Sequence, residues 1–300
     1  MILVVGATGM VGTSVCRRLA ERGIPTRALV RATSDPAKVD RLETLGVDIV
    51  RGDLRDPASL AEGCRDASTV ICTVSSMPFS YQPGVNDIAT TDLAGVRHLV
   101  DAARASGVVE QFVYLSFSKN LDLDFPLRNA KRAVEDHLRL SGLTWTILRP
   151  SCFMEVWLSP AVGFDPANGS ATIYGTGEKP VSYISLEDVA EITVRSLTSP
   201  AARNAILELG GPEALSQAQA VQLFERIYGR PITVQHVPAE ALLAQQAAAT
   251  DPMAQSFSGL MRCVAAGDAI DMRPVLQAMP MALVSIEEFA KASRPVVAAG

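Results

Sequence analysis

The sequence lacks any run rich in lysine or arginine, and its 300 residues carry a net charge of −5. A nucleic-acid-binding surface needs clustered positive charge, so none is expected. The sequence has no CxxC pair, and none of its three histidines stands at a metal-ligand spacing from another. We therefore expect no metal site, and we expect reduced, mostly buried thiols at the scattered cysteines, which are Cys16, Cys64, Cys72, Cys152 and Cys263.

Signals for secretion or membrane insertion are also missing. The first ten residues, MILVVGATGM, are apolar, but they are too few to cross a bilayer. They have neither the basic start nor the small-residue cleavage site of a signal peptide. With 48% apolar and 20% charged residues, the composition is that of an ordinary globular protein. A cytoplasmic location is the resulting expectation.

Short apolar runs alternate with amphipathic stretches through the first half of the chain. Strands are expected at 1–5, 25–30, 47–51, 68–74, 110–116 and 143–148. Helices are expected between them at 10–22, 36–45, just after Pro57, at 86–106 and at 127–141. Repeated strand–helix–strand units with right-handed crossovers predict an α/β fold, in which a doubly wound parallel sheet carries helices on both faces.

The strongest motif is a glycine-rich loop between the first strand and the first helix. It reads Gly6, Ala7, Thr8, Gly9, Met10, Val11 and Gly12. Gly6 permits a tight turn, Gly9 lets a pyrophosphate approach the backbone, and Gly12 lets the helix pack closely on the sheet. The helix amino terminus offers N–H groups and a positive dipole end to phosphate. This context predicts a dinucleotide-binding Rossmann fold rather than an ordinary strand-to-helix turn.

The end of the second expected strand indicates which dinucleotide binds. Sites specific for NAD have an acidic residue there, which accepts hydrogen bonds from the ribose 2′-hydroxyl. Arg31 stands at this position instead, and an arginine can pair with a 2′-phosphate. Thr33 and Ser34 add hydroxyl donors, and Lys38 could add a second charge. The sequence therefore predicts NADP, with NADPH preferred over NADH, although a solvated surface arginine is the alternative.

Two further strand ends should meet the same ligand crevice. Asp53 and Leu54 follow the third strand, where the carboxylate could accept a hydrogen bond from the adenine amine. The residues after the fourth strand should line the pyrophosphate and the nicotinamide ribose, and these are Thr73, Val74, Ser75 and Ser76.

The alternating pattern loosens after Pro150. We expect an NAD(P)-binding domain over 1–150, with 181–210 returning to its sheet through a strand at 181–184, a helix at 186–198 and a strand at 205–209. The stretches 151–180 and 211–300 should form a smaller, mostly helical substrate-binding or cap region. Four large apolar residues fit either an apolar pocket wall or plain core, and these are Phe153, Met154, Trp157 and Phe164.

With these features the chain resembles the atypical short-chain dehydrogenase/reductases of the NmrA-like kind. The resemblance covers roughly residues 1–230 and rests on GATGMVG, RGDLRDPASL, DLAGVRHLVDAARASGV, LRPSCFME and GEKPVSYISLEDVAEI. Asp92 and Gly95 occupy recurring positions of the third segment. The resemblance implies an NAD(P)-binding oxidoreductase, and it places Pro150, in the turn after the sixth strand, near the cofactor.

The family's usual catalytic motif is Tyr-x-x-x-Lys with a nearby serine, and this sequence departs from it. Lys131 stands in the matching helix, but Leu127 occupies the tyrosine position. Related reductases of plant phenolics are similar in using the lysine without that tyrosine. Lys131 could hold the nicotinamide ribose or act as acid or base. The alternative is a surface lysine paired with Glu135.

The resemblance adds other polar candidates after the fifth strand. Ser118 aligns with the family's catalytic serine and Ser116 ends the strand, while Asn120 and Asn129 are weaker candidates. Two functions then fit the sequence. One is an NADPH-dependent reductase of a small carbonyl, quinone or enone-like substrate. The alternative is a non-catalytic NADP(H)-binding redox sensor, regulator or assembly factor, which the missing tyrosine favours, whereas the retained lysine and serines favour the reductase. A monomer, a homodimer and a complex with a protein partner are all compatible with the sequence.

Overall fold

A computed structural model describes residues 1–294 and divides the chain into two compact units. Among the described residues, the first unit comprises 1–117, 125–149 and 189–207, and the second comprises 118–124, 150–188 and 208–294. Relative to a boundary at residue 150, this division assigns 118–124 and 181–188 to the second unit. Each unit is described separately below.

The first unit is built on a seven-stranded sheet with the order β10-β6-β5-β4-β1-β2-β3. Strands β1 to β6 pair in parallel, and the four residues of β1 are all buried because helices cover both faces. The doubly wound α/β sheet expected from the sequence is thereby confirmed. The strands are β1 (Ile2–Val5), β2 (Thr26–Val30), β3 (Asp48–Arg51), β4 (Thr69–Cys72), β5 (Gln111–Leu115), β6 (Thr144–Pro150) and β10 (Ala205–Leu209).

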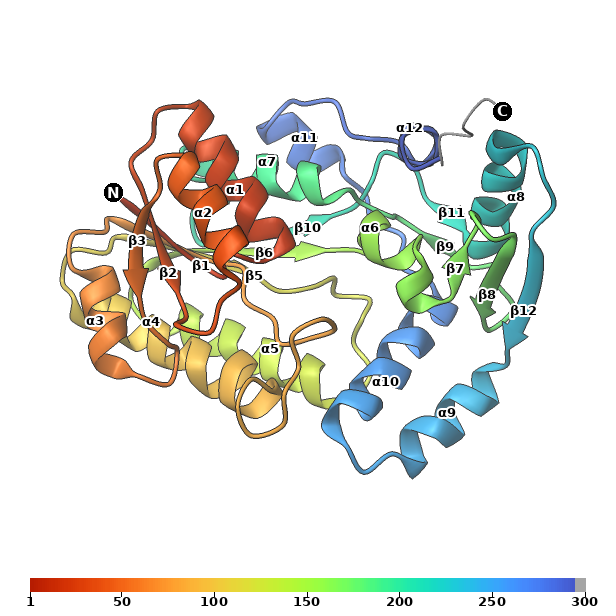
Figure 1. Cartoon of the computed structure of the whole chain (residues 1–300), viewed down its shortest axis with the longest axis horizontal. Coiled ribbons are helices and arrows are strands. Elements are labelled where there is room, and N and C mark those ends of the chain that lie inside the picture. The colour runs from red at the N-terminus through yellow and green to blue at the C-terminus, as the bar shows by residue number, and fades with distance from the viewer. Residues whose placement is uncertain (295–300) are drawn as a thin grey trace. The chain divides into compact units, whose positions relative to one another are not determined.

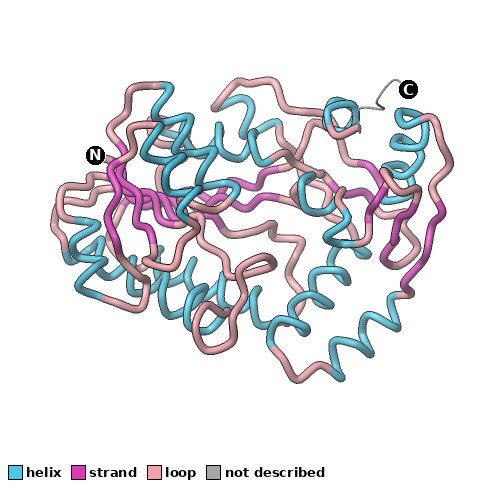
Figure 2. The backbone as a smooth tube through the Cα atoms, viewed as in Figure 1, coloured by secondary structure: helices cyan, strands magenta, loops and turns pink. Residues whose placement is uncertain are grey.

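Helices cover both faces of this sheet. Figure 1 shows α1 and α2 on one face and α3, α4 and α5 on the other, and Figure 2 shows the strands as the layer between them. Between the sheet and α3–α5, fully buried residues such as Leu3, Leu99, Phe112 and Val134 form the apolar core. The helices of this unit are α1 (Met10–Glu21), α2 (Pro36–Thr44), α3 (Pro57–Cys64), α4 (Val96–Ala105), α5 (Pro126–Arg139), most of α7 (Leu186–Ser196) and the short η3 (Pro200–Ala202).

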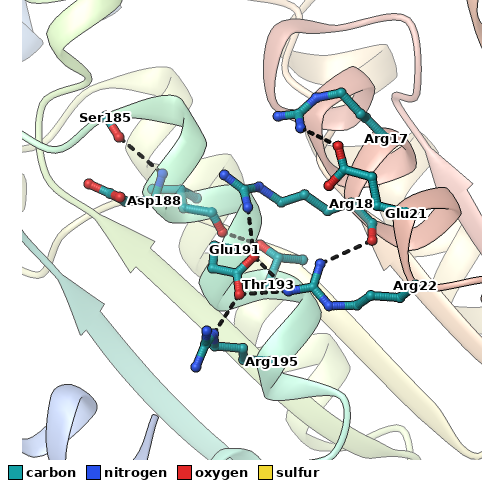
Figure 3. A network of polar contacts seen from close by, with 10 residues as sticks. Arg17, Arg18, Glu21, Arg22, Ser185, Asp188, Glu191, Thr193 and Arg195 are labelled. Atoms are coloured by element: carbon teal, nitrogen blue, oxygen red, sulfur yellow. Dashed lines mark hydrogen bonds and ion pairs between the residues drawn. The ribbon is translucent and has the colours of Figure 1, made fainter. Parts of the chain in front are cut away.

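Helix α7 is tied to α1 through the carboxylate of Glu191, whose side chain is 8% exposed. Arg18 and Arg22, from α1 and its carboxyl cap, donate hydrogen bonds to this carboxylate, each at 2.7 Å. Arg195, one turn further along α7, donates at 2.5 Å. Figure 3 shows the three guanidinium groups converging on the one carboxylate. The contacts satisfy a buried charge and fix α7 beside α1.

The single helix expected at 86–106 consists of two different helices. Residues Ile88–Gly95 form a π-helix, η1, and only Val96–Ala105 continue as α4. Asp87 caps the start through a reciprocal pair of hydrogen bonds with Thr90. At the junction, a Cβ on Gly95 would lie 2.8 Å from the Cβ of Leu54, so the glycine allows the helix to approach the loop after β3. π-Helical turns are rare and frequent at functional sites.

The second unit contains two small sheets. β9 (Pro180–Val181) pairs with β11 (Leu215–Ser216) in antiparallel fashion, and a three-stranded sheet has the order β12-β8-β7. The latter contains β7 (Phe164–Asp165), β8 (Ser170–Tyr174) and β12 (Thr233–Val237). The helices are α6 (Met154–Trp157), η2 (Pro160–Val162), α8 (Gln217–Tyr228), α9 (Ala239–Ala248), α10 (Pro252–Ala266), α11 (Arg273–Ala278) and α12 (Ile286–Ala292).

Within the segment 181–210, β10 lies in the seven-stranded sheet, but the strand expected at 181–184 does not. That stretch is bonded inside the second unit. Ser182 N donates to Asp268 O at 2.8 Å, and Ile184 N donates to Cys152 O at 3.0 Å. Its backbone groups are therefore satisfied away from the Rossmann sheet. Over residues 1–294, no helix has both the length and the apolar character needed to cross a membrane.

Candidate functional site

The glycine loop leads directly from β1 into α1. Gly9 N donates to Gly6 O at 2.9 Å, and Gly6 has a φ of +89°, a conformation that favours glycine. Gly9 is the N-cap of α1, and no side chain caps the helix there. The first N–H groups of a helix have no partners within the helix. The loop therefore presents backbone donors and the positive dipole end of a 12-residue helix.

The three glycines of the motif are required for different reasons. A Cβ on Gly12 would lie 2.1 Å from Gly6 O, and a Cβ on Gly6 would lie 2.7 Å from Thr73 Oγ1, so the protein's own packing demands both glycines. A Cβ on Gly9 would meet only Gly6 O, at 3.1 Å. The space beside Gly9 is thus hardly used by the protein itself. This open cradle over unpaired N–H groups fits the pyrophosphate of a dinucleotide.

The adenosine-side candidates lie after β2 and β3. Arg31 follows β2 and is half-buried, and its carbonyl oxygen accepts a hydrogen bond from Ser34 N at 3.1 Å. Lys38 is exposed on α2. Asp53 is already bound by Arg55, whose Nε and Nη2 donate to its two oxygens at 2.9 and 2.8 Å. These hydrogen bonds lower the pKa of Asp53. The carboxylate proposed to meet adenine therefore has an internal partner.

The residues after β4 join the glycine loop to the interior. Thr73 Oγ1 lies 3.3 Å from the carbonyl oxygens of Val5 and Gly6, so it is seated against the loop. The next residue, Val74, accepts a hydrogen bond from Lys131 Nζ at 2.8 Å. The structure therefore brings the predicted residues Thr73, Val74 and Lys131 together at one end of the sheet.

Lys131 is not a surface residue. It is 3% exposed, and its ammonium group lies 3.5 Å from both the Leu115 carbonyl oxygen and Asp92 Oδ1. The alternative of an exposed pair with Glu135 is wrong, because Glu135 binds Arg132 at 2.7 Å and also binds Arg149. A buried ammonium group requires partners of this kind to offset its desolvation.

Asp92 was not among the residues predicted for the site, although it completes this network. It lies in η1 with no exposed surface, and it accepts hydrogen bonds from Ser76 N at 3.0 Å and Ser76 Oγ at 2.5 Å. Its other oxygen, Oδ1, has no hydrogen-bond partner in the described chain. The sequence did contain a signal for it. Asp92 lies four residues from both Ile88 and Val96, which puts a carboxylate on the apolar, buried face of the expected helix.

Two tyrosine-related positions also bear on the chemistry. Leu127, at the tyrosine position of the Tyr-x-x-x-Lys motif, is 4% exposed, so a buried apolar side chain fills that position. Tyr114 is fully buried on β5, with its ring centroid 5.3 Å from Lys131 Nζ. Burial raises the pKa of Tyr114, and its hydroxyl has no hydrogen-bond partner among residues 1–294. Buried polar atoms without a hydrogen bond are rare, and two of them, Asp92 Oδ1 and the Tyr114 hydroxyl, lie near Lys131.

The predicted serines lie in different units. Ser116 is buried in the first unit, and its hydroxyl lies 3.4 Å from Arg132 Nη1. Ser118 belongs to the second unit, where its hydroxyl donates to Asp268 at 2.5 Å and its backbone N donates to Pro150 O at 2.9 Å. The roles given to these residues remain predictions.

Asp268 was not predicted, and its carboxylate is the common acceptor for several buried polar groups of the second unit. It has no exposed surface and also accepts hydrogen bonds from Asn120 Nδ2 at 2.8 Å and Ser151 Oγ at 2.7 Å. Burial raises the pKa of Asp268. Because Ser118 donates to this carboxylate, its hydroxyl proton is already engaged. No sequence pattern links residues so far apart.

Three of the four large apolar residues noted in the sequence lie in a core or against it. Met154 and Phe164 are in the apolar core of the second unit, with Trp157 packed against it. A cavity of about 10 Å³ touches Trp157 and Phe164, and it is far too small for a substrate. The five cysteines are buried and unpaired as expected, and burial raises the pKa of Cys16 to about 12, which leaves that thiol unreactive.

Comparisons with known proteins identify a family and several relatives. The NmrA-like family matches residues 1–290. An NAD(P)H azoreductase from Xenophilus azovorans is 30% identical over 263 residues, which are 87% of this chain and 85% of the relative. The photosystem II assembly factor Ycf39 of Cyanophora paradoxa is 31% identical over 239 residues, covering 79% of this chain and 71% of the relative.

A solved structure shows the same fold. The NADPH-dependent quinone oxidoreductase QOR2 of Escherichia coli, in complex with NADPH, superimposes with a TM-score of 0.78. The match covers 97% of this chain and 99% of that structure at 21% identity. On the strength of the family match over residues 1–290, the chain belongs to the NmrA-like family.

Proposed function

We propose that the protein is an NADPH-dependent oxidoreductase that reduces a small carbonyl, quinone or enone-like compound by hydride transfer. One observation carries the proposal. Thr73 contacts the glycine loop, and the adjoining Val74 binds the buried ammonium group of Lys131. A phosphate-binding loop and a buried cation therefore share one strand end, which is where ligands bind in open α/β sheets. The azoreductase among the relatives supports the same class of reaction.

Residues of the first unit would hold the cofactor. The glycine loop offers its N–H groups to the pyrophosphate, and Arg31 offers a guanidinium group to the 2′-phosphate. Bound NADPH supplies the hydride. The amino group of Lys131 is buried and is held by Asp92 and by the carbonyl oxygens of Val74 and Leu115. From there it can hold the nicotinamide ribose or stabilise negative charge that develops on a substrate oxygen.

A proton must also reach the reduced product. Leu127 cannot donate one, so the proton has to come from Lys131, Ser118 or water. The hydroxyl proton of Ser118 is engaged by Asp268 at 2.5 Å. Lys131 is therefore the first residue to test as the positioned acid or electrostatic group.

The experiment compares Lys131→Met with wild type in single-turnover oxidation of NADPH, using the best substrate from a panel of quinones, azo dyes and aldehydes. We expect turnover to fall by about 10²-fold or more and NADPH affinity to change much less, because the loop and Arg31 supply most of the binding. Arg139→Met, an exposed arginine on the same helix, is the matched control and should leave turnover unchanged. A rate equal to wild type in Lys131→Met removes this lysine from the mechanism.

Loss of the buried charge could also weaken the fold, because Asp92 would then lack a cation. The double variant Lys131→Met with Asp92→Asn removes both charges and separates the two effects. If turnover stays low in the double variant while circular dichroism and urea unfolding are restored, the loss is chemical.

A second function is favoured by a different observation. The buried leucine at position 127 and the likeness to the assembly factor Ycf39 both fit a protein that holds NADP(H) without turning it over. Tight NADPH binding, together with no oxidation of NADPH across the whole substrate panel, would support this regulator or assembly factor over the reductase.

A further inference from the structure

Strands β2 and β3 lie side by side at the edge of the sheet, and arginines mark their carboxyl ends. The parallel register pairs Val30 with Arg51, so Arg51 neighbours the end of β2. The exposed side chain of Arg51 turns toward β2, and its Nη1 donates to the Arg31 carbonyl oxygen at 3.3 Å. One hydrogen bond leaves most of the five N–H donors of a guanidinium group available.

At the opposite end of the same two strands, an arginine has a carboxylate partner. There the register pairs Arg27 with Asp48, and Arg27 Nε donates to Asp48 Oδ2 at 2.8 Å. At the carboxyl end, neither Arg31 nor Arg51 forms an ion pair with any carboxylate of residues 1–294. The carboxylate that follows β3, Asp53, is bound by Arg55.

Carboxylates near this end of the strands already have other partners. Asp53, which Arg55 holds, also interacts electrostatically with Arg31 without forming an ion pair with it. Asp35, the N-cap of α2, uses its carboxylate to accept a hydrogen bond from Ala37 N at 2.9 Å. The loop between β2 and α2 adds the hydroxyl groups of Thr33 and Ser34, which can donate to an anion. Arg31 and Arg51 stand at adjacent strand ends, and a bound dianion would offer charge-assisted hydrogen bonds to both side chains.

We infer that Arg51 is a second determinant of cofactor choice, and that Arg31 and Arg51 hold the 2′-phosphate of NADPH from two adjacent strand ends. The inference rests on the proposed function and deepens it. Arg31 occupies the position from which Rossmann folds read the ribose 2′ group. Arg51 reaches the same place from β3, through its hydrogen bond to the backbone of Arg31.

The test measures dissociation constants for NADPH and NADH by fluorescence titration, together with competition by 2′,5′-ADP and 5′-AMP. Arg51→Gln should weaken NADPH and 2′,5′-ADP by roughly tenfold and leave NADH and 5′-AMP unchanged, because one charge-assisted hydrogen bond is lost. Arg31→Gln should act similarly, and the double variant should bring NADPH close to NADH. Arg27→Gln, on β2 but paired with Asp48, is the matched control and should not change the NADPH-to-NADH ratio.

The outcomes separate the two proposals. If the wild-type protein binds neither dinucleotide, the proposed function fails and this inference fails with it. If the wild type prefers NADPH and Arg51→Gln keeps the same preference, only the inference about Arg51 is overturned. Since Arg51 is exposed, its replacement should not disturb folding, and circular dichroism checks this.

Discussion

The two ends of helix α1 differ in the charged partners that the protein provides for them. At the amino end, Gly9 supplies no side-chain cap, and a Cβ there would meet a single protein atom. At the carboxyl end, Arg17 pairs with Glu21 at 2.7 Å, and Arg18 and Arg22 pair with Glu191 (Figure 3). The helix dipole favours an anion at the first end and cations at the second.

The difference lies in whether the chain itself supplies the opposite charge. Around Glu191 it does, and hydrogen bonds from Arg22 and Arg195 outweigh the effect of burial, so the pKa of Glu191 is lowered. At the glycine loop no side chain of the helix start supplies an anion. A charged end that the protein completes contributes to stability, and one that it leaves open is suited to a ligand.

The largest effect is expected from Gly9→Val. A branched side chain would fill the cradle, so dinucleotide binding should be lost by at least about 10²-fold while the fold is kept. Gly23→Ala adds a side chain just past the other end of α1, where no atom lies within 4 Å. Its φ of +64° makes that change strained, so it should cost some stability but leave binding intact. Fluorescence titration, on protein shown to be folded by circular dichroism, measures both. Retained binding in Gly9→Val would mean that the cofactor lies elsewhere.

Gly12→Ala should separate packing from binding within the same loop. Its Cβ would lie 2.1 Å from Gly6 O, so backbone must move. We expect the free energy of unfolding to fall by about 3 kcal/mol, the upper part of the range for overpacking. Urea unfolding gives the value, and Gly9→Ala is the control, with a much smaller loss. Equal losses in the two variants would contradict the distinction between a packing glycine and a ligand glycine.

Glu191→Gln tests the completed end of the helix. Three arginines would lose their common anion, and the free energy of unfolding should fall by about 2 kcal/mol. This is below the range for fully buried pairs, because the three arginine side chains are 21%, 36% and 39% exposed. Glu21→Gln removes an exposed i,i+4 pair and should cost less than about 0.5 kcal/mol. Urea unfolding of both variants checks the order.

The smallest effect is expected in the pH dependence of stability. A carboxylate whose pKa is lowered by folding stabilises the fold above its unfolded pKa, and that contribution disappears as the pH falls through the folded pKa. For Glu191 the ordinary value is 4.5. The stability gap between wild type and Glu191→Gln should therefore be full at neutral pH and should narrow below that value. Urea midpoints between about pH 6 and about pH 3 measure the gap, and a constant gap would exclude Glu191 as the titrating group.

Much of the fold and part of the candidate site follow from local sequence. The strand expected at 205–209 is Ala205–Leu209, and the glycine loop lies between β1 and α1 as expected. The π-helix η1 before α4 was not predicted, because apolar spacing over eight residues does not distinguish a π-helix from an α-helix. The pairing of 180–181 with β11 was also missed, since a two-residue strand carries no periodic signal.

The sequence by itself determined the doubly wound sheet and the phosphate loop, because strand alternation and glycine spacing depend on neighbouring residues. Only the tertiary structure decided the state of the charged groups. Whether Lys131 was an exposed lysine or a buried cation depended on Asp92, which approaches it to 3.5 Å from another helix. Arg18 likewise meets Glu191 across 173 residues of sequence. Burial and charge pairing are set by distance in space, and a single sequence does not contain that distance.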